Sequence, residues 1–409
     1  MRILVVSQYF YPETFRINDI VSFLVKSNHT VTVLTGLPNY PIGEVFDGYN
    51  QSHNNISEVF GAKVVRCKLR PRHKGLKNLL LNYLSFVIAG SKKIKTIKDN
   101  FDAILVYGVS PITQALPALK YGKKNKIPVF LYCCDLWPEV VRGAKYGHKE
   151  LSKKNIIYLV AKFVSKHIYK KVDKIITKCH YFEQYLHDEL GIADRKICTL
   201  YEHAESQYLN VIKKPIDNGV IDFMFLGHLG KIQNCEQILS AFATLNCNTP
   251  TALHFVGDGS ESENLKLLTK RLGIENKVFF YGHVPIEETI KYYNFADVCV
   301  LALSNKTKTG FTIPAKLTGY MAACRPIVAS INGESRDIIE KANCGYVCSA
   351  DDLNMLSILF QKVIDNYGYF SKLGLNGRSF FEKHLTIDRF TNELVKIMQN
   401  TISERNNNY

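Results

Sequence analysis

The 409-residue sequence lacks several features that would assign it to particular classes of protein. No apolar run approaches the ~20 residues of a membrane-spanning helix, and the opening residues MRILVV form too short an apolar segment for a signal peptide. The eleven cysteines include no Cys-x-x-Cys pair, so we expect reduced thiols in the cytoplasm and no zinc site. With 46% hydrophobic and 22% charged residues, the composition is that of a globular protein.

The positive charge is distributed unevenly along the chain. Residues 1–200 contain 31 Lys and Arg against 15 Asp and Glu, whereas the remaining residues contain 21 against 22. The first half therefore carries the whole excess, which predicts an anionic partner for that half: nucleic acid, anionic lipid or a phosphorylated substrate.

Apolar segments of strand length alternate with segments of helical spacing, and this order runs twice. The predicted strands are Ile3–Ser7, Val31–Leu34, Val64–Cys67, Ala103–Val106, Pro128–Tyr132, Lys174–Thr177, Asp222–Leu226, Leu253–Val256, Val278–Tyr281, Val298–Leu303 and Ile327–Ala329. The pattern predicts an α/β protein with two Rossmann-like, doubly wound parallel-sheet domains that face a central cleft. We expect the first domain at 1–200, a linker at 201–218 and the second domain at 219–385.

The segment VFLYCCDLWPEV raises the question of why a buried strand should run into a carboxylate, Asp135. Ligands of such folds bind beyond the carboxyl ends of the strands, so this position favours a role in the site. The alternative is that Asp135 caps the helix that follows it. Glu139, in the first turn of that helix, would serve only the helix dipole, and Trp137 either stacks on a ligand ring or fills the core.

Two segments of the second half have the composition of phosphate-binding loops. In FLGHLGKIQ, Gly227 and Gly230 would let the backbone approach a phosphate, with charge from His228 and Lys231, although an ordinary strand–helix turn has the same form. In SNKTKTGFTIPAK, N–H groups at a helix start and Lys316 would meet a diphosphate. The N–H groups belong to Thr309, Gly310, Phe311 and Thr312.

These motifs, in this order, resemble those of a known enzyme family over essentially the whole chain. The matching segments are QYFYPETFRINDI, HTVTVLTGLPNYPIG, DLWPEVV, FLGHLGKIQNCEQIL, HFVGDGSESENLKLL, VFFYGHVP, YNFADVCVLALS and IPAKLTGYMAACRPIVAS. The family is that of the retaining GT-B glycosyltransferases of family 4. The resemblance is to the O-antigen, capsule and colanic acid branch, which includes L-fucosamine transferases.

The resemblance implies transfer of a sugar, expected to be an N-acetylated amino or deoxyamino sugar, from a UDP-linked donor with retention of anomeric configuration. The implied acceptor is a polyprenyl-diphosphate-linked saccharide or a growing surface polysaccharide such as lipopolysaccharide. Asp135 would orient the acceptor hydroxyl, take its proton or stabilise the reacting carbon, with Trp137 and Glu139 beside the acceptor. Arg16 and Asn18 would contact the acceptor from the front loop. The backbone at Val284 would contact the nucleotide base. We expect the last segment, 386–409, to cross back to the first domain as a helix with a disordered tail.

The chain departs from the family at the donor site. The family usually has Arg just after the first glycine of FLGHLG and Lys near position 233, where this chain has His228 and Gln233. The family's two glutamates, seven residues apart, are missing, since no Glu occurs from Thr289 to Gly333. We expect Glu334 to supply the ribose contact. No Asp-x-Asp occurs either, so we expect no metal and no cofactor, with the leaving-group charge met by side chains and helix dipoles.

Two segments of the basic half read as amphipathic helices flanked by lysines, namely Leu79–Gly90 and Lys149–Lys174. We expect them to lie on the anionic inner face of the plasma membrane, which makes the protein cytoplasmic and peripherally attached. The alternative is that their apolar faces pack on the sheet while the lysines are merely solvated.

Other functions remain open. A sugar-nucleotide epimerase of the same fold and a catalytically inactive sugar-nucleotide-binding protein are the alternatives to a transferase. We expect no nucleic-acid partner, because the chain lacks zinc spacing, an RNP-like aromatic run and a base-reading basic helix.

Overall fold

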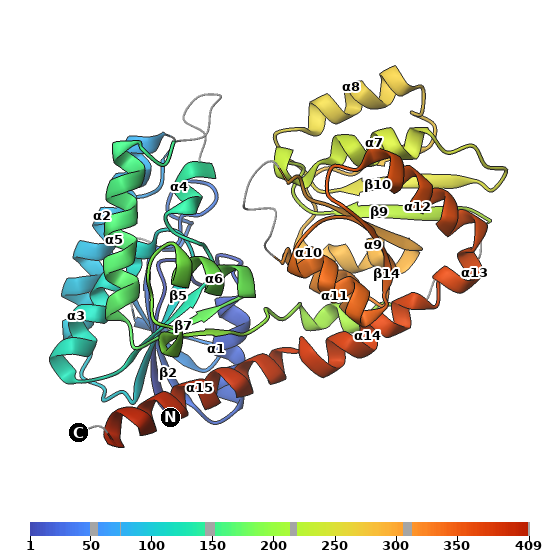
Figure 1. Ribbon diagram of the computed structural model, residues 1–409. Helices are drawn as coiled ribbons and strands as arrows, with labels where there is room; N and C mark the ends of the chain where they lie inside the picture. Colours follow the sequence, from blue (N-terminus) through green and yellow to red (C-terminus); the bar gives the residue numbers. More distant parts are fainter. Residues whose placement is uncertain (50–55, 74, 144–151, 213–218, 306–312, 408–409) are drawn as a thin grey trace. The chain divides into compact units, whose positions relative to one another are not determined.

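The computed structural model describes residues 1–49, 56–73, 75–143, 152–212, 219–305 and 313–407. The chain forms two compact units (Figure 1). The first comprises Met1–Leu200 together with Ile387–Tyr409, and the second comprises Tyr201–Thr386.

The first unit is built on an eight-stranded sheet in the order β3-β4-β2-β1-β5-β6-β7-β8. All neighbours pair in parallel except β3 and β4, which are antiparallel. The strands are β1 (Arg2–Val6), β2 (Thr30–Gly36), β3 (Ile56–Val59), β4 (Ala62–Cys67), β5 (Ala103–Gly108), β6 (Val129–Cys133), β7 (Lys174–Thr177) and β8 (Ile197–Thr199). The central strands are continuous apolar runs because helices cover both faces of a parallel sheet.

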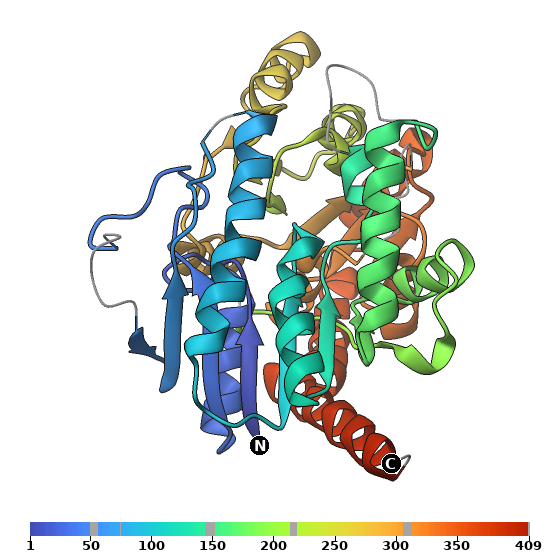
Figure 2. The ribbon, with the colours of Figure 1, turned by 90° about the vertical axis from the view of Figure 1, so that its left-hand side faces the viewer.

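Helices of the first unit cover the sheet in two layers. Figure 2 shows α2, α3 and α5 on one face, with α3 between the other two. On the other face α1 packs against α15. The helices are α1 (Ile17–Lys26), α2 (Leu76–Lys93), α3 (Ala115–Asn125), α4 (Glu139–Gly143), α5 (Ile156–Lys171), α6 (His180–Asp188) and α15 (Ile387–Asn407), with 3-10 turns η1 (Ile94–Thr96), η2 (Ile112–Gln114) and η3 (Asp194–Lys196).

The last helix, α15, is a component of the first unit although it follows the second in sequence. Its buried stripe of Ile387, Phe390, Leu394 and Met398 joins the core of this unit. The Phe390 ring lies 5.2 Å from that of Tyr132 in β6, between ring centroids. Apolar residues at helical spacing explain the packing, since they place one face of the helix on the core.

The second unit holds a six-stranded sheet, parallel throughout, in the order β11-β10-β9-β12-β13-β14. The strands are β9 (Ile221–Leu226), β10 (Thr251–Val256), β11 (Val278–Phe280), β12 (Val298–Ala302), β13 (Ile327–Ser330) and β14 (Gly345–Cys348). The helices are α7 (Cys235–Ala243), α8 (Ser262–Leu272), α9 (Thr289–Phe295), α10 (Ala315–Ala322), α11 (Glu334–Ala342), α12 (Leu353–Asp365), α13 (Tyr367–Phe370) and α14 (Leu373–His384), with 3-10 turns η4 (Ser206–Asn210), η5 (Lys231–Gln233) and η6 (Ile286–Glu288).

The first part of the predicted linker packs on the second unit. The Thr289 hydroxyl donates to the Tyr208 hydroxyl at 3.2 Å, and Arg325 Nη2 donates to the Ile212 carbonyl at 2.8 Å. Residues 201–212 are thus held by side chains of this unit, while 213–218 lie outside the described residues.

The predicted fold class is confirmed, since both units are parallel-sheet α/β domains. Three strands were not predicted, β3, β8 and β14, and each lies at the edge of its sheet. Edge strands are short and have few buried residues, so they lack the apolar run that marks a central strand. No helix within the described ranges is both long and apolar enough to cross a membrane.

Candidate active site

The carboxyl edge of the first sheet brings Asp135 and Trp137 together through a serine. Ser110 follows β5 and Asp135 follows the neighbouring strand β6. The Ser110 N–H and hydroxyl both donate to Asp135 Oδ2, at 2.7 and 2.6 Å, and Trp137 Nε1 donates to Ser110 Oγ at 3.1 Å. Among the described residues no donor reaches Asp135 Oδ1. One oxygen of a half-buried carboxylate is therefore fixed, and the other is left to accept from a ligand.

The structure does not support the alternative that Asp135 caps the helix that follows it. The helix α4 begins at Glu139, and the carboxylate of Asp135 is bonded to Ser110 instead of to N–H groups of that helix. The backbone N–H of Asp135 donates to the Gly108 carbonyl at 3.1 Å, which continues the pairing of β5 with β6.

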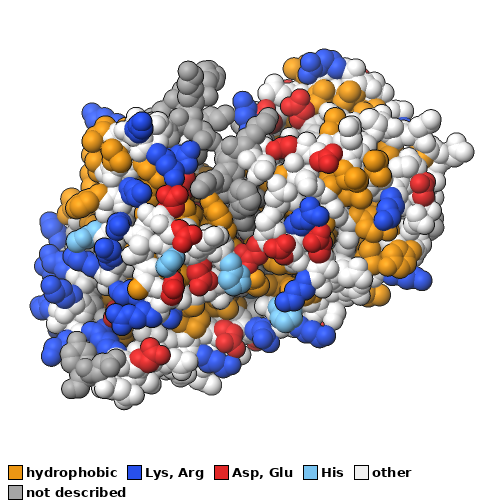
Figure 3. Space-filling view, viewed as in Figure 1, with side chains coloured by type: hydrophobic (Ala, Val, Ile, Leu, Met, Phe, Trp, Pro, Cys, Tyr) orange, Lys and Arg blue, Asp and Glu red, His pale blue; other side chains and the backbone are white. Residues whose placement is uncertain are grey.

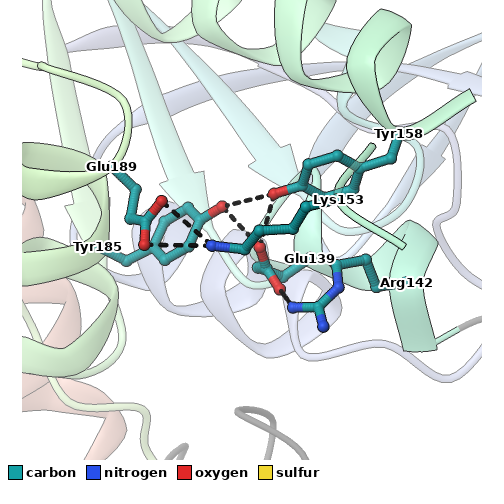
Figure 4. Close-up of polar contacts among 6 residues, drawn as sticks. All are labelled: Glu139, Arg142, Lys153, Tyr158, Tyr185 and Glu189. Carbon is teal, nitrogen blue, oxygen red and sulfur yellow. Dashed lines mark hydrogen bonds and ion pairs between the residues drawn. The ribbon is translucent and has the colours of Figure 1, made fainter. Parts of the chain in front are cut away.

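Glu139 lies in a buried cage of hydrogen bonds (Figure 4). Its Oε1 accepts from the hydroxyls of Tyr158 and Tyr185, each at 2.8 Å, and its Oε2 accepts from Arg142 Nη1 at 2.8 Å. Burial alone raises the pKa of Glu139, but the bonds from Tyr185, Tyr158 and Arg142 outweigh it and lower the pKa below its usual value. Both oxygens are engaged, so this geometry favours a role in positioning over the predicted contact with the acceptor.

The front loop is held together by its own polar groups. The Asn18 amide donates to the Glu13 carbonyl at 2.8 Å and accepts from the Tyr11 N–H at 3.1 Å, so Asn18 braces the loop. The buried Glu13 carboxylate accepts from the N–H groups of Asn39 and Tyr40, at 2.9 and 2.8 Å. Burial raises the pKa of Glu13 to about 7 in spite of these bonds. Arg16, the residue before α1, is half-buried, and its contact with the acceptor stays a prediction.

The sequence interpretation missed Ser110 and the polar cluster behind it. The Gln8 N–H donates to Gln114 Oε1 at 2.8 Å, and Gln8 Nε2 donates to Asn82 Oδ1 at 2.7 Å, all in the buried interior. The rule that singled out Asp135, a polar residue just after a strand, also applies to Ser110. The partners Gln114 and Asn82 come from helical segments far along the chain, so no local pattern identifies them.

In the second unit, Gly227 makes room for Lys316. Gly227 has φ 139°, and a Cβ added there would lie 3.2 Å from Lys316 Nζ. The turn after β10 packs on it so closely that a Cβ on Gly257 would lie 2.0 Å from the Gly227 carbonyl oxygen. Both positions need glycine, because each has a positive φ and leaves no room for a Cβ. The two turns and Lys316 can therefore pack closely at the carboxyl ends of β9 and β10.

The ammonium group of Lys316 is buried without an anionic partner among the described residues. Its Nζ is buried, lies 3.7 Å from the centroid of the Phe225 ring and has no hydrogen-bond partner in the described part of the chain. Burial lowers the pKa of Lys316 to about 8. A buried polar group without a partner is costly, so the position favours an anionic ligand that restores the ammonium's hydrogen bonds.

The remaining predicted donor residues are arranged less tightly. His228 is exposed and Gly230 buried, while Lys231 is exposed and lies 4.0 Å from Glu261 between Nζ and Oε1. After Gly230, residues Lys231–Gln233 form a 3-10 turn, and α7 begins at Cys235. A pocket adjoins this turn, lined by Gly230, Lys231, Asn234, Cys235, Glu236, Glu261, Asn264, Leu265, Leu267, Leu268, Arg271 and Ser304.

Glu334 and Val284 lie on other loops at the carboxyl edge of this sheet. Glu334 is the first residue of α11, half-buried, and its Oε1 accepts from the Tyr201 hydroxyl at 2.6 Å. Val284 is half-buried in the segment between β11 and η6. This segment is tied to the Gly257 turn, since the Gly257 N–H donates to the Gly282 carbonyl at 2.9 Å.

Four predicted donor residues cannot be placed. Thr309, Gly310, Phe311 and Thr312 lie outside the described residues. The helix that follows them, α10, starts at Ala315, with Pro314 as its N-cap residue. Within the described ranges, no group of three or more His, Cys, Asp or Glu side chains is arranged to hold a metal ion.

Two family models match consecutive parts of the chain. Residues 16–202 match Glycosyltransferase Family 4, and residues 209–380 match Glycosyl transferases group 1. The chain is also similar to WbjE of Pseudomonas aeruginosa, described as a "Probable glycosyltransferase", with 23% identity over 64% of this chain and 66% of that protein. It is 22% identical to WcaI of Escherichia coli K12, a candidate colanic acid biosynthesis glycosyl transferase, over 79% of this chain and 81% of WcaI.

The fold is shared with solved structures. The structure of Anabaena Alr3699/HepE in complex with UDP superposes with a TM-score of 0.70 at 13% identity, over 98% of this chain and 100% of that one. Together with the two parallel-sheet units, and with family models that cover most of both of them, these similarities lead to one conclusion. The chain is a glycosyltransferase with the GT-B fold, whose first part matches the Glycosyltransferase Family 4 model and whose second part matches the Glycosyl transferases group 1 model.

Proposed function

We propose that the protein transfers a sugar from a UDP-linked donor to a lipid-linked saccharide, with retention of anomeric configuration. The observation that carries this proposal is the buried ammonium of Lys316 beside Gly227. A diphosphate at this position would supply the missing anion, and backbone N–H groups of the neighbouring turns would add further donors. The UDP bound in the HepE structure supports UDP as the nucleotide.

The donor site differs from the usual family arrangement. We propose that Lys316 carries the positive charge that other family members place on an Arg and a Lys in the turn corresponding to FLGHLGKIQ. Lys231 and His228 are exposed on that turn, where they would add charge to the leaving diphosphate. Glu334, fixed by Tyr201, takes the ribose contact. Charge that develops on the leaving group is thereby met by preorganised cations and N–H groups.

On the acceptor side, Asp135 has the clearest role. Its Oδ1 accepts a hydrogen bond from the acceptor's hydroxyl and so orients that hydroxyl, while Ser110 holds Oδ2. Trp137 presents a half-buried indole whose orientation is fixed by the same serine. In a retaining reaction the departing phosphate can take the hydroxyl's proton, so Asp135 acts by orientation and by stabilising positive charge at the reacting carbon.

Contact with an anionic membrane surface is part of the proposal. The predicted apolar faces do not pack wholly on the sheet: Leu80, Leu84 and Ile88 of α2 are exposed, four residues apart along one face. Exposed apolar residues with lysines near them are typical of helices that lie on anionic lipid. The resemblance to WcaI supports a surface-polysaccharide acceptor carried on such a membrane.

The test is a transfer assay on the full chain. UDP-linked N-acetylated amino sugars and polyprenyl-diphosphate-linked saccharides are offered as substrates, and UDP release is measured with and without acceptor. Acceptor-dependent release that Asp135→Asn reduces by about 100-fold or more supports the proposal. Binding of UDP without release on any pair of substrates would favour the inactive sugar-nucleotide-binding protein.

A further inference from the structure

Helix α5 has two faces with different contacts. Its outer face exposes Ile156, Leu159, Val160 and Phe163, with Phe163 74% exposed and Ile156 69% exposed. Lysines border this stripe at Lys154, Lys162, Lys166, Lys170 and Lys171. Figure 3 shows hydrophobic side chains on the surface over α2 and α5, with lysine and arginine side chains around them. An apolar stripe within a basic rim is complementary to an anionic lipid leaflet, so we take lipid as the partner of this face.

The inner face of the same helix holds the loop that carries the candidate acceptor residues. In the first turn of α5, the hydroxyl of the buried Tyr158 donates to Glu139 Oε1 at 2.8 Å. In its last turn, the fully buried Tyr169 accepts the Trp137 N–H at 3.2 Å through its hydroxyl oxygen. The loop 135–143 is therefore bonded to both ends of α5.

Glu139 is the centre of this link. Tyr185, from α6, donates to the same oxygen as Tyr158, and Arg142 holds the other oxygen from the next turn of α4 (Figure 4). A buried carboxylate is tolerated only while its partners stay in place, because its charge is costly without them. A change in the position of α5 is thus transmitted to α4 and to the residues before it.

We infer that Glu139 is a positioning residue that couples lipid contact of α5 to the loop of Asp135 and Trp137. When the outer stripe of α5 seats on an anionic leaflet, the Tyr158–Glu139–Tyr185 link and the Tyr169–Trp137 bond hold the loop in its acceptor-binding arrangement. The inference rests on the proposed function, since it requires that α5 meets a membrane.

The chain supplies its own reporter for a test. Trp137 is the only tryptophan, and it lies on the loop in question. Vesicles of phosphatidylcholine and phosphatidylglycerol are added to the full chain, binding is measured by sedimentation, and the emission maximum of Trp137 is recorded. The variants are Glu139→Gln, Tyr158→Phe and the pair Tyr158→Phe with Tyr185→Phe, each checked for folding by its thermal midpoint.

The matched control is Glu189→Gln. Lys153 and Glu189 form an ion pair at 3.2 Å close to the same tyrosines, and this pair is separate from the hydrogen bonds that hold Glu139 (Figure 4). We expect vesicles to shift the emission of the wild type and of Glu189→Gln. The shift should be lost in the double Tyr→Phe variant and in Glu139→Gln, both of which should still bind vesicles as the wild type does.

Three outcomes contradict the inference. If no vesicle binding occurs, lipid contact itself is wrong, and the proposed attachment fails together with the inference. If vesicles bind but the emission of the wild type does not change, the coupling is wrong and the attachment stands. If the shift persists in the folded Glu139 and tyrosine variants, Trp137 is responding to lipid by another route, and Glu139 is not the link.

Discussion

At the scale of single residues, the proposed donor site depends on Lys316. Its ammonium is buried, it rests on the Phe225 ring, and burial lowers its pKa to about 8. The family's usual cations are replaced by His228 and Gln233 on the turn nearby. We therefore propose that this single buried lysine is the main source of positive charge for a diphosphate.

Replacing Lys316 by Met should weaken UDP binding by about 10- to 100-fold, since a hydrogen bond to a charged group contributes ~1.5–3 kcal/mol. Isothermal titration measures this directly. The control is Lys231→Met, an exposed lysine whose loss should change the affinity only slightly. Equal losses in the two variants would contradict the central role of Lys316.

The lowered pKa of Lys316 also predicts a pH dependence. The free folded protein loses this proton near pH 8, whereas a bound diphosphate favours the charged ammonium and raises the pKa. UDP binding should then take up a proton above about pH 8, and its affinity should fall towards tenfold per pH unit there. Titration in buffers of different ionisation enthalpy measures the uptake, which Lys316→Met should abolish.

Because Ser110 fixes one oxygen of Asp135, Ser110→Ala and Asp135→Asn should reduce the transfer rate by different amounts. Asp135→Asn removes the charge and should reduce transfer by about 100-fold or more. Ser110→Ala keeps the charge and loses the hydroxyl's two hydrogen bonds, one to Asp135 and one from Trp137, which should cost about tenfold in kcat/KM. A folded Asp135→Asn variant with full transfer rate would contradict the acceptor role.

The contacts of Glu139 predict that the free energy of unfolding of the first unit falls at acid pH. Its pKa is lowered in the folded protein by Tyr185, Tyr158 and Arg142, so the stabilisation is complete above its usual pKa of 4.5 and is lost as pH falls below that value. Denaturant unfolding at neutral and acid pH, read from Trp137 fluorescence, measures this. Glu139→Gln should be less stable than wild type at neutral pH, and the difference should shrink at acid pH. A difference independent of pH would contradict an ionised Glu139.

At the scale of elements, the central strands and the order of helices could be predicted because their apolar runs and spacings are local. The position of Asp135 after β6 could be predicted for the same reason, as could glycines at the turn after β9. The Glu139 cage and the Ser110 bond could not, because Tyr158, Tyr185 and Ser110 come from other elements and meet only when the sheet is assembled. The edge strands β3, β8 and β14 could not be predicted because they are short and lack a continuous apolar run.

The turn after β10 provides a test of element packing. Gly257→Ala would place a Cβ 2.0 Å from the Gly227 carbonyl oxygen and should destabilise the second unit by ~2 kcal/mol or more. Gly273 also has positive φ but has no atom within 4 Å of an added Cβ, so Gly273→Ala should cost only ~1 kcal/mol. Similar unfolding free energies for the two variants would show that the two turns do not pack as described.

At the scale of the whole molecule, the chain uses its last helix to complete its first unit. Leu394 of α15 is fully buried in that core. Leu394→Ala should lower the stability of the first unit by ~2–5 kcal/mol, and Trp137 reports on that unit alone because it is the only tryptophan. The exposed Lys396→Ala is the control, and an equal effect of both would contradict the packing of α15.

The charge of the molecule follows the same division. The excess of Lys and Arg lies within residues 1–200, in the unit that exposes the stripes of α2 and α5. The second unit is nearly neutral and holds the buried Lys316. We therefore propose that lipid and acceptor bind the first unit and the nucleotide sugar binds the second.

The measurement that tests the central claim most directly is a thermal-shift titration of the full chain with UDP, GDP, ADP and dTDP, without added metal. A ligand that binds only the native state stabilises it by ~2.7 kcal/mol at a hundredfold excess over its dissociation constant. We predict a rise in the thermal midpoint that is largest with UDP and is lost in Lys316→Met. No rise with any nucleotide, or a rise that persists unchanged in Lys316→Met, would contradict it.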